Sequence, residues 1–113
     1  MPTTFTWPVR VYYEDTDAGG VVYHAQYLKF MERARTEWLR ELGFDQTRLA
    51  EEQQLMFVAH EVNIKFAKPA RLNDLLEVTA SVESLKRVSL VFAQTISRDD
   101  EIISRASVSI ACV

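Results

Sequence analysis

A short polar stretch near the N-terminus holds the side chains best suited to chemistry. It runs from Tyr13 to His24, with Glu14, Asp15 and Asp17 placed before a pair of glycines. A carboxylate can act as a nucleophile or a general base toward a carbonyl carbon. The start of a helix carries unpaired N–H groups and a positive dipole potential, which stabilise a developing oxyanion. If a helix begins directly after this stretch, both requirements of acyl transfer meet there.

A solvated acidic loop with a structural turn explains the same residues, and composition alone favours that simpler interpretation. Gly19 and Gly20 are adjacent in a chain with only three glycines, which indicates that the backbone bends sharply there. Elsewhere the sequence holds no Ser-His-Asp motif, no cluster of metal ligands and no phosphate-binding glycine loop. The stretch is therefore the main candidate for a reaction site, and we expect neither a metal nor an organic cofactor.

A long helix is predicted directly after this stretch. From about residue 25 to 42, apolar residues recur at helical spacing, at Tyr27, Met31, Ala34, Trp38 and Leu42. The apolar stripe is widened by Leu28, Phe30 and Leu39. Gly43 supplies a stop. A second, shorter helix is expected from Gln46 to about Gln54, with Asp45 as its N-cap.

The remaining segments have the alternation of strands. Phe5–Tyr13 is rich in aromatic and β-branched residues, and Pro8 either delays its start to about Val9 or places it on a sheet edge. Residues 56–66, 76–82, 88–96 and 102–112 alternate apolar and polar side chains. A long helix packed on a long antiparallel sheet is an α+β fold, and the length of 113 residues suits one domain over residues 1–113.

Composition narrows the function classes. The net charge of -3 gives no overall attraction to nucleic acid or to anionic lipid. The single cysteine, Cys112, cannot form an intrachain disulfide, which fits a reducing compartment. The N-terminus does not resemble a signal peptide, and no apolar run approaches the roughly 20 residues of a membrane span. We expect a cytoplasmic protein without a nucleic-acid partner or an integral membrane segment.

Several segments of the chain closely resemble the YbgC family. The resemblance is carried by residues 12–24, by Tyr27 and Phe30, by residues 32–37 and by residues 66–74, and it continues to the final strand. That family comprises the Tol-Pal-associated acyl-CoA thioesterases, relatives of 4-hydroxybenzoyl-CoA thioesterase. The resemblance implies a hotdog fold, in which a five- to six-stranded antiparallel sheet wraps the long helix. Chains of that family usually continue into a short basic, proline-containing tail, whereas this sequence ends at Val113.

The resemblance also implies an activity and a site. The substrate would be an acyl-CoA or acyl carrier protein thioester, with coenzyme A as part of the substrate and not a cofactor. The family's catalytic carboxylate falls on Asp17, and its thioester-polarising backbone N–H falls on His24. Direct attack by Asp17 and activation of a water both remain open. The expected substrate-binding residues are Tyr13, Gly19, Gly20, Val21, Val22, Tyr23 and Tyr27.

Basic residues outside this stretch have two interpretations. Lys65, Lys68 and Arg71 cluster around one turn, and Lys86 and Arg87 form another basic pair. Surface solubility is the simpler explanation for both groups. Because coenzyme A is polyanionic, one of the two groups is also a candidate for binding its phosphates.

Three further residues are interpreted as structural. His60 interrupts an apolar alternation, so we expect it to be hydrogen-bonded in the core or at an interface. Cys112, on the last strand, is expected to serve packing. Glu32 is expected to pair with Arg35 or Thr36 across one helical turn.

Two other functions and an assembly follow from the same features. A hotdog hydratase or dehydratase would need a His and Asp pair in another arrangement, which is absent from this sequence. A non-catalytic acyl-carrier or envelope-complex binding module is the second alternative, against which Asp17 and the glycine turn argue. Long strand edges are normally covered in proteins. We therefore expect a homodimer joined edge to edge, or a homotetramer.

Overall fold

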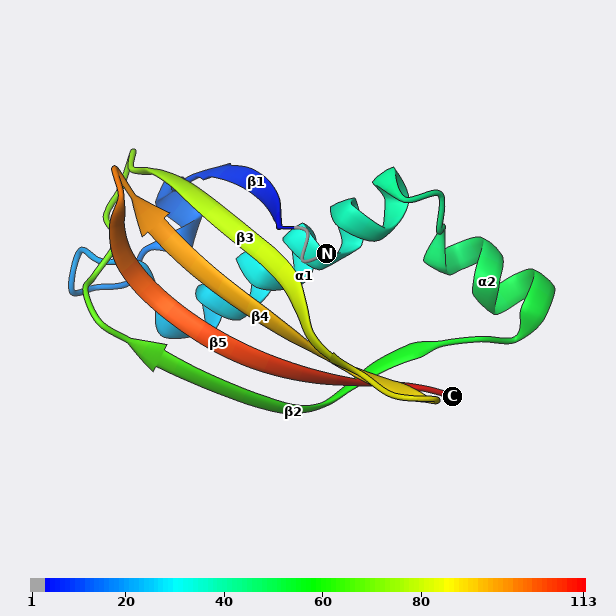
Figure 1. Cartoon of the computed structure of the whole chain (residues 1–113). Helices are drawn as coiled ribbons and strands as arrows, with labels where there is room; N and C mark the ends of the chain where they lie inside the picture. The colour runs from blue at the N-terminus through cyan, green and yellow to red at the C-terminus, as the bar shows by residue number, and fades with distance from the viewer. Residues whose placement is uncertain (1–3) are drawn as a thin grey trace.

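A curved antiparallel sheet wraps one long helix in the computed structural model, which describes residues 4–113 (Figure 1). The strands are β1 (Phe5–Arg10), β2 (Phe57–Phe66), β3 (Leu75–Leu85), β4 (Ser89–Arg98) and β5 (Glu101–Cys112). Their order across the sheet is β1-β3-β4-β5-β2. The helices are α1 (His24–Glu41) and α2 (Gln46–Gln53), and a single 3₁₀ turn, η1, spans Tyr13–Asp15. The predicted α+β hotdog arrangement is confirmed, with five strands in the sheet.

Strand β1 lies at one edge of the sheet and pairs only with β3. This position accommodates Pro8, whose nitrogen has no hydrogen to donate to a second neighbour. The edge interpretation of Pro8 is therefore confirmed, whereas a start near Val9 is wrong. The strand also ends at Arg10, because the chain turns into η1 before Tyr13.

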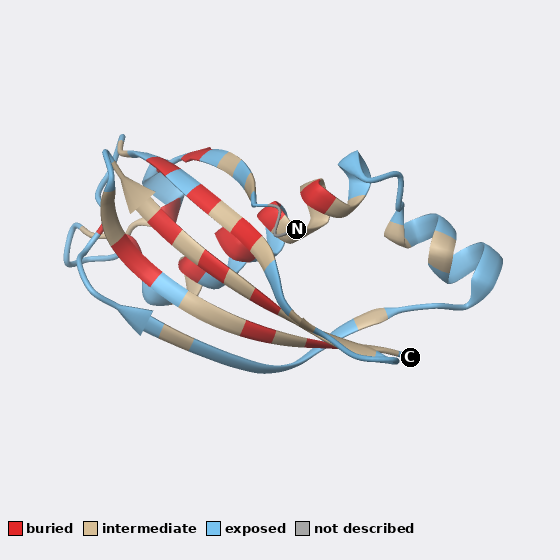
Figure 2. Ribbon diagram, viewed as in Figure 1, coloured by how far each residue is buried: buried red, intermediate tan, exposed pale blue. Residues whose placement is uncertain are grey.

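Helix α1 packs over β1, β3 and β4 and supplies one side of the core. Its buried residues follow the predicted stripe and are Tyr27, Phe30, Met31, Ala34 and Trp38. These residues belong to core clusters together with buried residues of the sheet, and Figure 2 shows buried bands on both α1 and the strands. Leu42 is exposed, contrary to prediction, because α1 ends at Glu41 and the chain turns away at Gly43 with φ +96°.

The half of the same face formed by β5 and β2 is only partly covered. Most residues of β2 are exposed, as Figure 2 shows. Val62 and Phe66 point to the α1 side of the sheet, because they pair with Val108 and Ser104, which are buried there. Both nevertheless remain largely exposed. Within residues 4–113, Val62 and Phe66 thus form an apolar strip at a free sheet edge that is only partly covered.

Strand β2 contains a bulge at His60. Ala59 pairs with Ile110 and Glu61 pairs with Ser109, so His60 is an extra residue on its strand. A bulge of this kind shifts the alternation of side chains by one position. His60 is exposed, and its predicted place in the core is wrong; its place at an interface stays a prediction.

Helix α2 projects away from the sheet, at the opposite end of the molecule from the turn that precedes α1 (Figure 1). Asp45 is its N-cap, as predicted, and its Oδ1 accepts hydrogen bonds from the N–H groups of Thr47 and Arg48. The helix ends at Gln53, and Gln54 follows with φ 56°. No residue of α2 is buried. Within residues 4–113, no helix is long and apolar enough to cross a membrane.

Candidate active site

Asp17 lies in a tight turn between η1 and α1. The Asp17 N–H donates to the Val21 carbonyl at 2.9 Å, and the Gly20 N–H donates to the Asp17 carbonyl at 3.0 Å. The Asp17 carboxylate accepts a hydrogen bond from the Gly19 N–H at 2.8 Å. The side chain remains exposed. The turn therefore presents a carboxylate that is held by its own backbone and is open to solvent.

The two glycines of this turn have different structural tasks. Gly20 has φ +80°, a conformation that residues with a side chain rarely adopt. A Cβ atom at Gly19 would lie 3.2 Å from the Asp17 carboxylate oxygen, which is a tight contact. Gly20 therefore allows the turn to form, and Gly19 leaves room for the carboxylate. The predicted sharp bend is confirmed at this position.

The first turn of α1 starts with free hydrogen-bond donors. Tyr23 is the N-cap residue, and its side chain makes no capping hydrogen bond. The Gln26 N–H donates to the Tyr23 carbonyl at 2.9 Å. In the described part of the chain, the N–H groups of His24 and Ala25 have no acceptor. They point out of the positive end of an 18-residue helix, where an oxyanion is stabilised.

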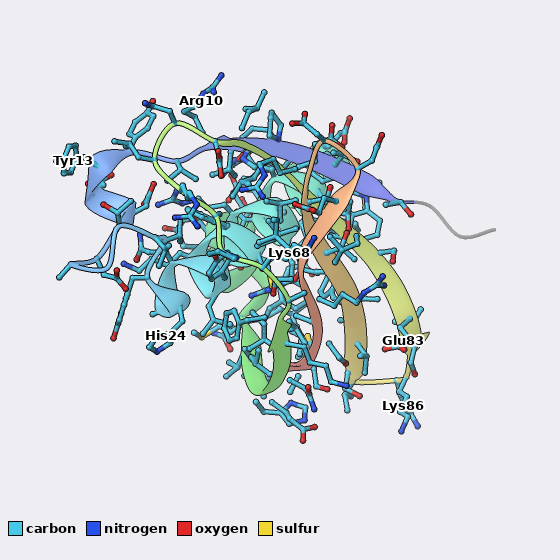
Figure 3. The ribbon with its side chains drawn as sticks, turned by 90° about the vertical axis from the view of Figure 1, so that its left-hand side faces the viewer. Arg10, Tyr13, His24, Lys68, Glu83 and Lys86 are labelled. Carbon is cyan, nitrogen blue, oxygen red and sulfur yellow. The ribbon has the colours of Figure 1, made fainter. Side chains whose placement is uncertain are left out.

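Aromatic rings line one side of this helix start. The rings of Tyr23 and His24 lie 4.5 Å apart, and the His24 ring lies 6.4 Å from that of Phe66. Figure 3 shows His24 at the surface of the molecule. Phe66 was not among the predicted site residues, because its place in an apolar alternation indicated only a strand. Its partial exposure at the end of β2 makes it a candidate wall of the site.

Tyr27 and Val22 support the site from inside. Tyr27 is only 3% exposed, and its hydroxyl accepts a hydrogen bond from the Ala70 N–H at 3.0 Å. The Val22 N–H donates to the Ala70 carbonyl at 2.8 Å. Burial raises the pKa of Tyr27 above its usual value of 10.0, which favours the neutral hydroxyl. Both residues were predicted to bind substrate, and the structure places them behind the exposed turn.

Tyr13 lies in η1 and is 81% exposed (Figure 3). Val21 is half-buried, and its carbonyl accepts the hydrogen bond from Asp17. Of the predicted binding residues, the structure thus brings Gly19, Gly20 and Val21 together at the carboxylate and places Tyr23 at the helix start.

Asp15 is a residue of this site that the sequence did not single out. Its side chain is 5% exposed, and its two carboxylate oxygens accept hydrogen bonds from the Tyr12 N–H and the Gln26 side chain, both at 2.8 Å. Its carbonyl accepts a further hydrogen bond from the Tyr23 N–H at 2.9 Å. Burial was not readable from the sequence, because Asp15 stands in an acidic run that also fits a solvated loop.

The basic groups near the site differ in their availability. Lys68 forms an ion pair with Glu101 at 2.6 Å. Arg98 binds both Asp74, at 2.6 Å, and Glu101, at 3.0 Å. Arg71 is exposed, and it has no ion pair within the region that the structure describes.

Lys86 and Arg87 lie in the turn between β3 and β4, far from Asp17 in the same chain. The 11 residues of β3 separate this turn from the end of the sheet that lies near Asp17, a span of about 36 Å. Figure 3 shows Lys86 and His24 on opposite sides of the molecule. The two basic groups that the sequence proposed for phosphate binding are thus at opposite ends of one chain.

A cavity of about 390 Å³ lies between the second half of α1, the start of α2 and the β2–β5–β4 part of the sheet. Its apolar wall includes Leu39, Phe57, Phe92 and Ile110. Arg35 also lines it and donates to the Gln94 side chain at 2.8 Å. Arg35 thus contacts the sheet, and within residues 4–113 Glu32 forms an ion pair with neither of its expected partners, Arg35 and Thr36, although its charge still acts on Arg35. Within residues 4–113, no cluster of His, Cys, Asp and Glu is placed to hold a metal.

Comparison with known proteins connects this geometry to a family. Residues 19–104 match the family model of the thioesterase superfamily. The chain belongs to the thioesterase superfamily. The acyl-CoA thioesterase YbgC of Haemophilus influenzae is 54% identical over 109 residues, which cover 96% of this chain and 80% of that protein. The acyl-CoA thioester hydrolase YbgC of Escherichia coli O157:H7 is 49% identical over 112 residues, covering 98% and 83%.

Solved structures of thioesterases have the same fold. A probable thioesterase from Bartonella henselae superposes with a TM-score of 0.94 at 37% identity, covering 98% of this chain and 92% of that one. The 1,4-dihydroxy-2-naphthoyl-CoA thioesterase from Synechocystis superposes with a TM-score of 0.92 at 26% identity, covering 98% and 82%. The YbgC-like, hotdog thioesterase assignment is confirmed, and the chain is a thioester hydrolase. The match to the family model begins at Gly19, two residues after Asp17, whereas the alignments with the two YbgC proteins extend over nearly the whole chain.

Proposed function

We propose that the chain hydrolyses acyl-CoA to a free acid and coenzyme A, with Asp17 as its catalytic carboxylate. One observation carries this proposal. The exposed Asp17 carboxylate is fixed by the Gly19 N–H, in a turn that leads directly to the unpaired N–H groups at the start of α1. The relatives named acyl-CoA thioesterases support coenzyme A as the thiol of the substrate.

Each group of the site has a role in this reaction. The carbonyl oxygen of the thioester accepts a hydrogen bond from the His24 N–H, where the helix dipole stabilises the negative charge that develops. Loss of such a donor typically costs about 100- to 1,000-fold in kcat. Asp17 either attacks the carbonyl carbon, giving an anhydride that water then opens, or takes a proton from the attacking water. In both routes the thiolate leaves and is protonated to coenzyme A.

A homodimer is the assembly that best completes this site. The free edge of β2 and the apolar strip beside it are suited to a second copy of the chain, which would extend the sheet and cover Val62 and Phe66. If the two β2 strands pair antiparallel about a two-fold axis, each subunit runs opposite to its partner. The far end of one subunit then lies beside the catalytic end of the other.

This antiparallel arrangement gives a role to the cavity beside Arg35 and to the basic pair Lys86 and Arg87. Arg35 lies about 16 Å along α1 from His24, so the cavity beside it is remote from Asp17 within one chain. In the antiparallel dimer, the partner's cavity would lie closer to Asp17 and would receive the acyl chain. Lys86 and Arg87 of the partner would then be nearer to the phosphates of coenzyme A, together with Arg71 of the catalytic subunit.

Acyl carrier protein thioesters are a second candidate substrate, because they present the acyl group on the same phosphopantetheine arm as coenzyme A. The Tol-Pal association that the YbgC resemblance implies, and the cytoplasmic location expected from the composition, belong to the same proposal. They predict an enzyme that acts on thioesters of the cell interior. The homotetramer would require a second interface in addition to the β2 edge.

Replacement of the carboxylate tests the proposal directly. Asp17→Asn should lower kcat by at least about 1,000-fold while the protein stays folded, because an amide is neither base nor nucleophile. Thiol release from a panel of acyl-CoAs measures this, and circular dichroism checks the fold. Glu14→Gln is the matched control, since Glu14 is exposed and should keep kcat within about twofold. Activity of Asp17→Asn within about threefold of wild type would remove Asp17 from its role.

The same assay separates the alternative function. A non-catalytic binding module would bind acyl-CoA without releasing thiol in the wild-type chain. Thiol release by wild type that disappears in Asp17→Asn excludes that alternative.

A further inference from the structure

Asp15 and Gln26 connect the turn that carries Asp17 to the first turn of α1. The Gln26 side-chain amide donates to one Asp15 carboxylate oxygen at 2.8 Å, and the Tyr12 N–H donates to the other at the same distance. The Asp15 carbonyl accepts from the Tyr23 N–H at 2.9 Å. Asp15 thus contacts the N-cap residue of α1 and the third residue of the helix, and its side chain is nearly inaccessible to solvent.

This connection stands in place of an ordinary helix cap. An ordinary N-cap side chain accepts the N–H of the second or third helical residue, as Asp45 does for two N–H groups of α2. Tyr23 caps nothing with its side chain. The start of α1 is held from outside the helix by Asp15, and the N–H groups of His24 and Ala25 stay free in the described chain.

We propose that Asp15 and Gln26 are positioning residues of the reaction. They fix the start of α1 relative to Asp17 without using the backbone donors that the thioester needs. This inference rests on the proposed function, because it assigns a purpose to the free donors of the same site. Neither residue contacts the reacting atoms in this role; both act through the placement of the His24 N–H.

Rigid placement matters because a misplacement of about 1 Å can cost on the order of 100-fold in rate. The hydrogen bond of the Gln26 side chain to Asp15 spans 11 positions of the sequence and crosses the whole turn. Its loss would loosen the helix start relative to the carboxylate, because only backbone hydrogen bonds would then cross the turn. KM should change little, since the cavity proposed for the acyl chain is not lined by Asp15 or Gln26.

Gln26→Met tests the proposal, because methionine has a similar length and helix propensity but no donor. We expect kcat to fall by about tenfold with KM within about twofold of wild type. Gln26→Lys restores a donor of similar reach and should recover most of the lost kcat. Hydrogen exchange of the segment 22–26 should accelerate in Gln26→Met and return toward the wild-type rate in Gln26→Lys.

Thr79→Val is the control for general loss of stability. The Thr79 hydroxyl lies between β3 and β4, accepts from the Thr95 N–H at 3.0 Å and does not touch the turn. This variant should lower the melting temperature and leave kcat unchanged. A wild-type kcat in Gln26→Met, or equal losses in Gln26→Met and Gln26→Lys, would overturn the positioning role. Absence of thiol release by wild type would instead remove the proposed function, and the exchange rates would still test the connection through Asp15.

Discussion

Gly19 and Gly20 are adjacent, but each is required for a different structural reason. The positive φ of Gly20 places the strain of any replacement in the backbone, since an added Cβ would have no neighbour within 4 Å. At Gly19 the conflict is with the Asp17 carboxylate oxygen, at 3.2 Å. Gly20 therefore matters for the folding of the turn, and Gly19 matters for the position of the Asp17 carboxylate.

This difference predicts opposite effects for the same small substitution. Gly20→Ala should lower the free energy of unfolding by about 1–2 kcal/mol, the usual cost of a left-handed residue with a side chain. Gly19→Ala should cost less stability and should lower kcat, because the carboxylate must shift. Urea unfolding and thiol release measure the two quantities. If Gly19→Ala keeps full kcat, the fixed position of the Asp17 oxygen has no catalytic importance. Gly20→Val would add β-branched strain to the same backbone effect.

The sequence identified a residue of the site when that type of residue was unusual among its neighbours. Asp17 and the glycine pair stand out, because carboxylates before a double glycine are rare in a glycine-poor chain. Asp15 and Phe66 did not stand out. Their importance comes from burial and from contacts with residues distant in sequence, which depend on how η1, α1 and β2 meet.

The loop between β2 and β3 is held at two places, one near the turn that carries Asp17 and one at the β4–β5 turn. Ala70 bonds to both Val22 and Tyr27, and the loop end is tied to the β4–β5 turn through Arg98. Burial alone would raise the pKa of Asp74, but hydrogen bonds from the Arg71 N–H and Arg98 outweigh it and lower the pKa below 3.8. Hydrogen bonds from Lys68 and Arg98 lower the pKa of Glu101 below 4.5.

These lowered pKa values predict a loss of stability in acid. Their contribution is fully present above the unfolded-state values of 3.8 and 4.5 and disappears as the pH falls through the lower folded-state values. Arg98→Met should lower the free energy of unfolding modestly at pH 7 and lessen the further loss between pH 5 and pH 2. Urea unfolding across this pH range measures the free energy of unfolding of both proteins. Arg105→Met, at an exposed cation outside the ion pairs of residues 4–113, should parallel wild type. An unchanged acid dependence in Arg98→Met would contradict the prediction.

The elements themselves followed from periodicity, with two exceptions. The bulge at His60 changes the phase of β2 while leaving its composition strand-like, so the single alternation predicted over residues 56–66 is interrupted and Val58 faces away from Val62. The end of β1 at Arg10 depends on the start of η1, which is fixed by the contacts of Asp15. Both exceptions are irregularities that a local pattern of apolar residues does not record.

At the scale of the whole molecule, the incomplete cover of the sheet is the feature that predicts assembly. Val58 and Val62 are each 42% exposed on the same edge strand, but the bulge turns them to opposite faces. Val62 lies on the α1 side, as part of the apolar strip, and Val58 lies on the convex side. The pair therefore allows one matched experiment on the proposed dimer.

Val62→Lys should convert the dimer to a monomer and abolish most thiol release, because a charge would be buried against the second copy and the shared site would be lost. Val58→Lys should leave the dimer intact. Light scattering at micromolar concentration gives the mass, and the acyl-CoA assay gives the activity. A strictly monomeric wild type with full activity, or a fully active monomer of Val62→Lys, would rule the shared site out.

The separation of α2 from the core has an evolutionary consequence. Its residues contribute no buried side chain, so changes in its length or composition cost the fold little. Its first residues nevertheless line the cavity beside Arg35. Substitutions in this helix can therefore reshape that cavity at little cost in folding, whereas substitutions in the turn that holds Asp17 disturb its hydrogen bonds. Substrate range and reaction chemistry are in this way free to evolve at different rates within one small domain.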